Sequence, residues 1–224
     1  MATDLHARPG VAQSVVPSVG GESAVRWMRF SHQGRTAYGI LEGDRVAEVA
    51  GDPFAGYQRT SRAHELAAVR IEVPVVPPTF YCVGLNYADH IREAAAKLGI
   101  KAELPSQPDV GYLAVNALIA HGEPVVIPRD ATKVQYEGEL AVLIGKQARN
   151  LSEAEALTCV LGYTIGNDVS ERAWQKSDRT LWRAKNADTF KPMGPGSRPT
   201  STSTRSRRAC ASTAARPRAF APTP

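Results

Sequence analysis

The feature that most limits how this chain can fold is an abrupt change of composition at Ser197. From Ser197 to Pro224 the chain has six arginines, no lysine and no acidic residue, and it consists almost entirely of Ser, Thr, Ala, Arg and Pro. Such a segment lacks the apolar periodicity that a buried core requires. We therefore expect residues 197–224 to be a disordered basic tail, and any core to be formed by the residues before them.

A second interpretation of residues 197–224, which we favour, is a reading-frame change in a GC-rich gene after the codon for Pro195. Codons can be chosen from Gly196 onward so that the shifted frame encodes alternating apolar and polar residues and an Asn-Gly turn. That pattern is typical of strands joined in a hairpin. On this interpretation the chain is C-terminally truncated, and the missing strands would leave apolar faces of residues 136–145 and 162–169 uncovered.

The composition and charge exclude several classes of protein. With 43% hydrophobic and 22% charged residues, the chain is neither collagen-like nor wholly disordered. It has no run of about eighteen apolar residues, so we expect no membrane partner. The net charge of +5 comes from the tail arginines, which lack interleaved aromatic residues and a folded platform, so we expect no nucleic-acid partner. Three widely spaced cysteines and an N-terminus without a signal-peptide pattern favour a cytoplasmic protein.

The order of periodic segments predicts an α+β, mostly β, chain of two domains. After a leader (residues 1–24) that we expect to be disordered, alternating segments separated by polar turns predict a small antiparallel β domain over residues 25–75. The Pro-rich end of residues 61–78 predicts a linker into a second domain, residues 76–196.

Within this second domain the sequence predicts helices over residues 88–99 and from the capping box Ser152–Glu155. Residues 79–86 form an apolar run, and residues 99–123 are expected to be mostly loop. The predicted strands are residues 124–128, 134–145 and 162–169.

Three carboxylates are candidates for a metal site. Glu137 and Glu139 lie in a strand-like run, and side chains two residues apart in a strand point to the same face. Two carboxylates so close are costly unless a cation or proton neutralises them. With Asp168 as a third oxygen donor, the set suits Mg²⁺ or Mn²⁺. An edge strand that exposes both glutamates to solvent fits the spacing equally well.

His90 and Glu93 are three residues apart in the first predicted helix of the second domain and share one of its faces. A carboxylate beside an imidazole orients it and raises its basicity, which suits a general base that activates water. An ordinary surface pair at the start of a helix explains the same spacing. Asp89 could be the N-cap of this helix.

Gln175 and Lys185 lie in a polar segment that also contains Trp174 and Trp182. A lysine near a metal-bound oxyanion would stabilise developing negative charge, and a surface lysine is the plain alternative. The sequence has no P-loop, no GxGxxG after a strand, and no CxxC, HExxH or GxSxG motif. Phosphate-cradling and acyl-serine enzymes therefore lose support.

Four motifs in series are more specific than these residues taken singly. They are YCVGLNYADHIREAA, YEGELAVLIGKQARNLSEAEAL, GYTIGNDVSERAWQ and WRAKNADTFKPMGP. In this order and spacing they resemble the fumarylacetoacetate hydrolase family over roughly residues 25–195. The resemblance is nearest to the branch of 2-hydroxyhepta-2,4-diene-1,7-dioate isomerases and acylpyruvate hydrolases. It implies a mixed β-roll, incomplete here, preceded by a small antiparallel N-terminal domain.

The resemblance also implies roles for the candidate residues. By motif position, Glu137, Glu139 and Asp168 would hold Mg²⁺ or Mn²⁺. His90 and Glu93 would be the catalytic dyad that activates water, on a lid-like segment that orders when substrate binds.

In the same way, Gln175 and Lys185 would bind substrate, with Lys185 also catalytic. The sequence departs from the family pattern at two places, one beside the metal glutamates and one where the resemblance ends. Gln135 stands where many members carry Asp, and Gly-Pro-Gly replaces Gly-Pro-Trp at residues 194–196.

Enzymes of this kind act on 2-oxo or 2-hydroxy-dienoic (di)acids through an enolate that the metal stabilises. The enolate can follow C–C hydrolysis, isomerisation or decarboxylation, so the motifs do not select the reaction. We expect a small 2-oxo acid as substrate, and a homodimer if the chain folds. The alternatives are an inactive fragment whose only role is subunit association and, more weakly, a nucleic-acid binder using the arginine tail.

Overall fold

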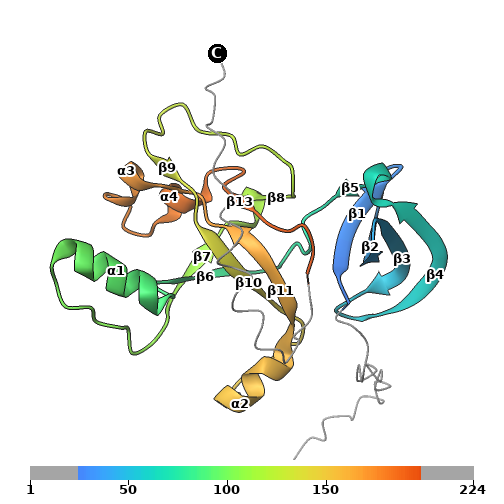
Figure 1. Ribbon diagram of the computed structural model, residues 1–224, viewed down its shortest axis with the longest axis horizontal. Coiled ribbons are helices and arrows are strands. Elements are labelled where there is room, and N and C mark those ends of the chain that lie inside the picture. Colours follow the sequence, from blue (N-terminus) through green and yellow to red (C-terminus); the bar gives the residue numbers. More distant parts are fainter. Residues whose placement is uncertain (1–24, 198–224) are drawn as a thin grey trace, which may run out of the picture.

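The computed structural model describes residues 25–197, so the predicted leader and the chain from Arg198 onward lie outside the described residues. The fold is α+β and consists mostly of strands, as the sequence predicts. Figure 1 shows two regions: a small curved sheet on one side and a larger region of paired strands bordered by helices on the other. Within the described part of the chain, no helix is long and apolar enough to cross a membrane.

The first region is a five-stranded antiparallel sheet in the order β4-β3-β2-β1-β5. Its strands are β1 (Trp27–His32), β2 (Arg35–Glu42), β3 (Arg45–Asp52), β4 (Gly56–Glu65) and β5 (Arg70–Ile71), with a 3₁₀ helix at Leu66–Ala68. The antiparallel N-terminal sheet agrees with the sequence prediction. The sequence of β4 has few apolar residues, and it is the pairing with β3 that makes it a strand. The Pro-rich end of residues 61–78, where a linker is predicted, forms no strand.

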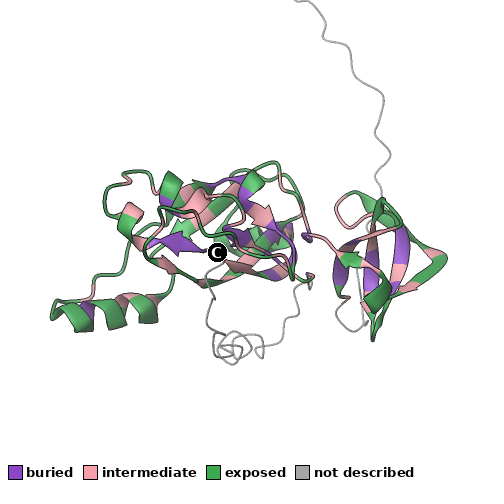
Figure 2. Cartoon of the chain, turned by 90° about the horizontal axis from the view of Figure 1, so that it is seen from above, coloured by how far each residue is buried: buried purple, intermediate pink, exposed green. Residues whose placement is uncertain are grey.

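Both faces of this sheet carry buried apolar side chains. One cluster contains Met28, Phe30 and Val46, and the other contains Trp27, Ile40 and Val49. Successive strand residues point to opposite faces, which is why the neighbours Trp27 and Met28 belong to different clusters. Figure 2 shows buried residues along several strands of this sheet. Each large side chain buried in this way contributes about 1.5–3 kcal/mol to folding.

The second region, residues 79–197, is built from strand pairs rather than one continuous sheet. The antiparallel pairs are β6 (Phe80–Gly84) with β7 (Asp109–Leu113), β9 (Val134–Gln135) with β12 (Ser170–Glu171), and β10 (Gly138–Ile144) with β11 (Val160–Asn167). The parallel pair is β8 (Leu118–Ile119) with β13 (Lys191–Pro192). The helices are α1 (Ala88–Leu98), α2 (Glu153–Ala156), α3 (Arg172–Gln175) and α4 (Trp182–Asn186), with 3₁₀ helices at Val115–Ala117 and Leu157–Cys159.

Two strand predictions in this region are wrong. Residues 124–128 form no strand, because prolines at both ends lack the N–H that a ladder needs. The backbone N–H of Val126 donates instead to the hydroxyl of Thr189, at 2.8 Å. Residues 134–145 are not one strand either, because the chain changes partner between β9, which pairs with β12, and β10, which pairs with β11.

The loop predicted over residues 99–123 contains two strands, β7 and the short β8. β7 pairs with β6 along its whole length, from Phe80 opposite Leu113 to Gly84 opposite Asp109. Two glycine-containing segments far apart in the sequence thus form a ladder that local composition did not indicate.

The helix predictions are confirmed, with one correction. α1 ends before Gly99, whose left-handed backbone (φ 67°) is the usual way to close a helix. The capping box of Ser152 and Glu155 begins α2, which is only 4 residues long. The N-cap of α1 is Tyr87, whereas Asp89 lies in the first turn and pairs with Arg92 at 2.7 Å.

The end of the second region returns to the first sheet. The backbone of Ser197 exchanges two hydrogen bonds with that of Trp27, at 2.8 and 2.9 Å. A Cβ added to Gly196 would lie 2.5 Å from the carbonyl oxygen of Trp27, so this crossing needs a glycine. The contact therefore depends on the residue that departs from the Gly-Pro-Trp pattern.

Candidate active site

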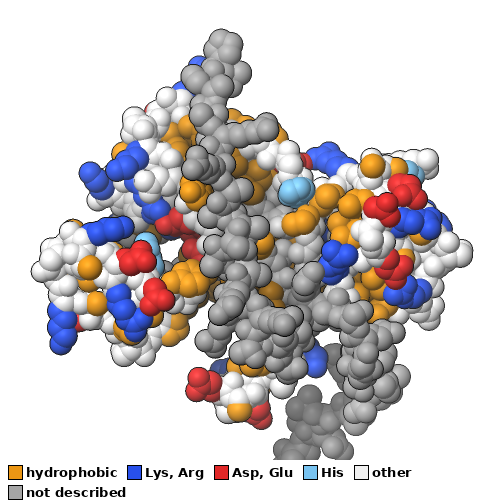
Figure 3. All heavy atoms as spheres, in the orientation of Figure 1, with side chains coloured by type: hydrophobic (Ala, Val, Ile, Leu, Met, Phe, Trp, Pro, Cys, Tyr) orange, Lys and Arg blue, Asp and Glu red, His pale blue; other side chains and the backbone are white. Residues whose placement is uncertain are grey.

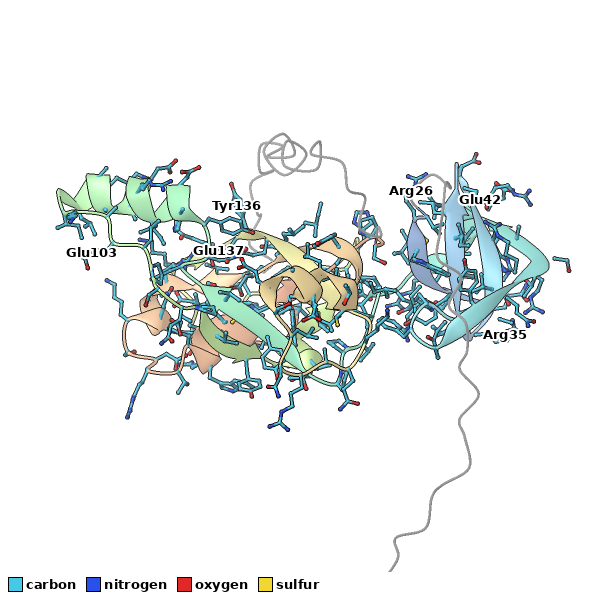
Figure 4. All side chains as sticks on the ribbon, turned by 90° about the horizontal axis from the view of Figure 1, so that it is seen from below. Arg26, Arg35, Glu42, Glu103, Tyr136 and Glu137 are labelled. Atoms are coloured by element: carbon cyan, nitrogen blue, oxygen red, sulfur yellow. The ribbon has the colours of Figure 1, made fainter. Side chains whose placement is uncertain are left out.

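The β10–β11 pair brings Glu137 and Asp168 together. Gly138 lies opposite Asn167 in the antiparallel register, so the residues just outside the pair are neighbours. The backbone N–H of Asp168 donates to the carbonyl of Glu137 at 2.9 Å, and the Asn167 side-chain oxygen accepts from the N–H of Glu137 at 3.0 Å. Figure 4 shows Tyr136 and Glu137 in the second region, away from the sheet that carries Arg35. Two predicted metal ligands thus lie side by side.

Lys185, on α4, lies between these two carboxylates. Its Nζ is 3.3 Å from Glu137 Oε2 and 3.0 Å from Ser170 Oγ, and it pairs closely with Asp168 Oδ2. Burial lowers the pKa of Lys185, but hydrogen bonds and charge from Asp168 and Glu137 outweigh it and hold the pKa above its ordinary value. The structure therefore brings the predicted catalytic lysine and two predicted metal ligands into one charged cluster.

Arg172 connects Gln175 to this cluster. Its guanidinium donates to the side-chain oxygens of Gln175 at 2.8 Å and Gln135 at 2.9 Å, and it pairs closely with Glu137. Because Gln135 is neutral, it accepts a hydrogen bond from Arg172 without adding a negative charge that would compete with Glu137 for the guanidinium. Sequence reasoning did not single out Arg172, because one arginine in a polar, arginine-containing segment carries no distinguishing signal.

Glu139 shares a face with Glu137. Glu139 is partly buried whereas its neighbours Gly138 and Leu140 are exposed, as the two-residue spacing predicts. Burial raises the pKa of Glu139 above its ordinary value, and the negative charges of Asp168 and Glu137 raise it further, against a hydrogen bond with Tyr87. The third predicted ligand therefore lies within electrostatic reach of the other two.

His90 and Glu93 both lie on α1, and both are exposed. Within residues 25–197, no hydrogen bond or ion pair joins either of them to the other or to the carboxylates. Figure 1 shows α1 at the border of the second region. At the start of the helix, the Tyr87 hydroxyl accepts from the N–H of Leu140 on β10 at 3.2 Å. The role of His90 and Glu93 as a catalytic dyad therefore stays a prediction.

The donor set fits a hard divalent cation in its chemistry. Glu137, Glu139 and Asp168 offer carboxylate oxygens, which Mg²⁺ prefers. Burial raises the pKa of Glu139, and the negative charges of Asp168 and Glu137 raise it further, so a cation beside this carboxylate would be stabilised. As the side chains stand, no three such groups within residues 25–197 are gathered closely enough to hold an ion. The ammonium of Lys185 lies between Glu137 and Asp168 instead.

Glu171 is a site-supporting residue that sequence reasoning missed. Its carboxylate is fully buried and accepts hydrogen bonds from the backbone N–H groups of Thr132 (3.0 Å), Lys133 (2.6 Å) and Trp174. Burial raises the pKa of Glu171, but these hydrogen bonds prevail and lower it below its ordinary value. Glu171 thereby ties a distant loop to the segment that carries Asp168. A single glutamate before a short helix gives no sequence signal of this role.

Lys191, on β13, is a second missed residue. Its side chain is 2% exposed, and its Nζ lies 2.9 Å from Asp168 Oδ1. Burial lowers the pKa of Lys191 below its ordinary value, and the charge of Asp168 opposes this shift. One lysine therefore lies beside each oxygen of Asp168.

Comparison with known families assigns both regions of the chain. Residues 79–214 match the family described as fumarylacetoacetate (FAA) hydrolase C-terminal, and residues 25–74 match the family described as Rv2993c-like, N-terminal. The first match covers more than half of the chain and includes every candidate site residue.

Individual relatives agree with this assignment. The chain is 41% identical over 148 residues to Protein Rv2993c of Mycobacterium tuberculosis (66% of this chain, 54% of that protein). It is 35% identical over 166 residues to oxaloacetate tautomerase YisK of Bacillus subtilis (70% and 53%). A solved structure, the 2-hydroxyhepta-2,4-diene-1,7-dioate isomerase of Mycobacterium marinum, superimposes with a TM-score of 0.67 at 34% identity (77% of this chain, 65% of that one). The chain spans about half the length of the curated relatives it matches. It belongs to the fumarylacetoacetate hydrolase family.

Proposed function

We propose that this chain carries the reaction centre of a divalent-metal-dependent enzyme that acts on 2-oxo or 2-hydroxy-dienoic diacids through an enolate. The observation that supports this most is the cluster of Glu137, Asp168 and Lys185, with Glu139 beside it. Carboxylates and a lysine gathered in one partly buried place suit a reaction in which negative charge develops on oxygen.

The residues divide into three tasks in this proposal. Glu137, Glu139 and Asp168 would hold Mg²⁺ or Mn²⁺, which when bound supplies Lewis-acid stabilisation to oxygen atoms of the substrate. Lys185 would stabilise the negative charge that develops as the enolate forms. Gln175 would contribute to binding the substrate, beside Arg172, whose guanidinium matches a carboxylate in shape and charge.

His90 and Glu93 would move the proton in this proposal. Glu93, one helical turn away on α1, would orient the imidazole of His90, which would take a proton from water or from the substrate carbon. Because both side chains are exposed and unpaired with the carboxylates, this role requires α1 to move toward the site when substrate binds.

The names of two relatives suggest which reaction to test first. One is a tautomerase of oxaloacetate and the other is an isomerase of a 2-hydroxy-diene-dioate, so both act on diacids. A proton shift of this kind passes through an enolate and needs no C–C cleavage. We therefore place tautomerisation or isomerisation of a 2-oxo diacid ahead of hydrolysis and decarboxylation for this chain.

The direct test is turnover by the purified chain. Enol–keto interconversion of oxaloacetate and hydrolysis of an acylpyruvate would each be followed by absorbance with Mg²⁺, with Mn²⁺ and with EDTA, against the metal-only background. We expect EDTA to abolish the enzymatic rate and Lys185→Met to lower kcat about 10²–10³-fold. Lys176→Met, an exposed lysine just after α3, serves as the matched control and should leave kcat unchanged.

Two results would contradict the proposal. A rate that resists both EDTA and Lys185→Met would remove the metal and the lysine from the mechanism. If the folded chain turned over none of these substrates with either metal, the alternative of a fragment that acts only in subunit association would take precedence.

A further inference from the structure

The least expected group near the site is the ammonium of Lys191. Its side chain is 2% exposed, which is rare for lysine because an ammonium loses its hydration on burial. Among the described residues, Asp168 is the one acid within ion-pair distance of Lys191. A buried charge with so specific a partner needs an explanation beyond packing.

The contacts of Lys191 fix its ammonium at one place. Nζ donates to the backbone carbonyls of Val169 at 2.9 Å and of Phe190 at 3.1 Å, and it lies 2.9 Å from Asp168 Oδ1. The Oδ1 contact lacks hydrogen-bond geometry, so it acts through charge. Two backbone anchors on different segments therefore hold a positive charge against one oxygen of the carboxylate.

The backbone around Lys191 is held on both sides. The N–H of Val169 donates to the carbonyl of Phe190 at 3.2 Å, and Lys191 and Pro192 pair in parallel with β8. The segment that follows Asp168 is thus bound to β13 at the level of Lys191. The ammonium has little freedom to move away from Asp168.

The second lysine beside Asp168 is held differently. Among the described residues, the ammonium of Lys185 contacts side chains alone, namely Glu137, Asp168 and Ser170, and the side chain is 13% exposed. It can therefore exchange those partners for a substrate oxygen or yield to an incoming cation, whereas Lys191 cannot move away without taking its hydrogen bond from the Val169 carbonyl.

We infer that Lys191 is a positioning residue that holds Oδ1 of Asp168, so that Oδ2 is presented toward Glu137 and Lys185. The inference rests on the proposed function, since its consequence is a carboxylate aimed at the metal. Groups that orient a metal ligand in this way typically contribute 10–100-fold to metal affinity.

Direct binding of Mn²⁺ tests this without relying on turnover. Free Mn²⁺ would be titrated by electron paramagnetic resonance against the full-length wild type, Lys191→Met and the control Lys176→Met, with thermal unfolding recorded for each. We expect Lys191→Met to bind Mn²⁺ at least about tenfold more weakly than wild type, and the control to bind equally.

The direction of the change separates positioning from simple electrostatics. Removing a positive charge beside a metal site should tighten Mn²⁺ binding if repulsion were its only effect. Unchanged or tighter binding by folded Lys191→Met would therefore overturn the inference, even if its melting temperature fell. Wild type that binds no Mn²⁺ would instead overturn the proposed metal site, and this inference with it.

Lys191→Arg decides the matter if Lys191→Met does not fold. The arginine keeps the charge, but its planar fork cannot reproduce a compact ammonium between two carbonyls and Oδ1. Weakened Mn²⁺ binding by folded Lys191→Arg would support positioning, and wild-type binding would overturn it.

Discussion

The two regions use the same strand-forming residues with different results. In the five-stranded sheet, alternating apolar side chains such as Phe30 and Val46 are 1% and 0% exposed. In the strand pairs of the second region, Tyr112 on β7 and Val142 on β10 are 66% and 47% exposed. Figure 3 shows hydrophobic side chains reaching the surface of the second region beside the residues drawn in grey. Alternation therefore determines which residues share a face of a sheet, but not whether anything covers that face.

The apolar side chains of the two regions differ in exposure because their strands differ in the number of neighbouring segments. β1 pairs on both sides, and the helical turn and β5 that follow β4 pack Leu66 and Ile71 over the Phe30 cluster. β10 pairs only with β11 among the described strands. Leu140, Val142 and Ile144 on one of its faces are about half exposed, whereas Leu143 on the other face is buried. Stability should accordingly be concentrated in the first region and chemistry in the second.

The largest effect is expected for Phe30→Ala. Removing this ring from a packed cluster should destabilise the first region by about 3–5 kcal/mol, because the cavity cannot close fully. Tyr112→Ala is the matched change in the second region, where the mostly exposed ring packs against Tyr81 at 5.1 Å between centroids. It should cost about 1 kcal/mol. Hydrogen exchange during urea unfolding, read by mass spectrometry, would measure both, and equal costs would refute the contrast between the regions.

The next largest effect is expected for Glu171→Gln. The amide keeps the shape of the carboxylate but cannot accept from Thr132, Lys133 and Trp174 together, so a buried N–H loses its acceptor at about 1–3 kcal/mol. Amide exchange should rise in residues 129–133 and 168–175 and stay unchanged in the first sheet. Glu153→Gln, at an exposed glutamate of α2, is the control. A uniform rise across both regions would show that they unfold as one unit.

A smaller, pH-dependent effect is expected at Glu48 in the first region. Burial raises its pKa, but hydrogen bonds from Arg62 and His64 and the charges of Arg62 and Arg35 prevail and hold the pKa below the ordinary 4.5. The stabilisation is therefore complete above about pH 4.5 and is lost as the pH falls toward the lowered value. Melting curves between pH 7 and pH 3 should show this loss in wild type and not in Glu48→Gln. Parallel curves for the two proteins would remove Glu48 as the cause.

The smallest effect is expected for Val142→Thr. The added hydroxyl remains in water at this half-exposed position, so the free energy of unfolding should change by less than about 0.5 kcal/mol. The same substitution at Val46 buries the hydroxyl and should cost about 1–3 kcal/mol. Denaturant titration of both variants measures the difference. A large loss in Val142→Thr would mean that its face is covered in solution.

Much of the site was predictable because it lies in local motifs. The pairing of Glu137 with Glu139 follows from strand geometry, and the helix that carries His90 and Glu93 follows from its periodicity and its closing glycine. Arg172, Glu171 and Lys191 were not predictable in this way. Each acts on residues that strand pairing brings near, and a lone charged residue carries no signal of such a partner.

The strand errors have the same origin. Residues 124–128 have strand-like composition but no available N–H at their prolines. β7 contains Asp109 and Gly111, which disfavour strands, yet it pairs with β6. The tendency of a residue to form a strand depends mainly on how its side chain packs against neighbouring strands, and the tertiary fold decides which strands are neighbours.

The sequence by itself determined the helices that begin the two predicted helical segments, the family motifs and the residue types able to hold a cation, because these depend on spacing within a few residues. Only the tertiary structure decided that Lys185 lies between Glu137 and Asp168 and that Lys191 is buried behind Asp168. It also decided that α1 leaves its dyad exposed. The free energy of a charge depends on distance and burial, and both are set by segments far apart in the chain.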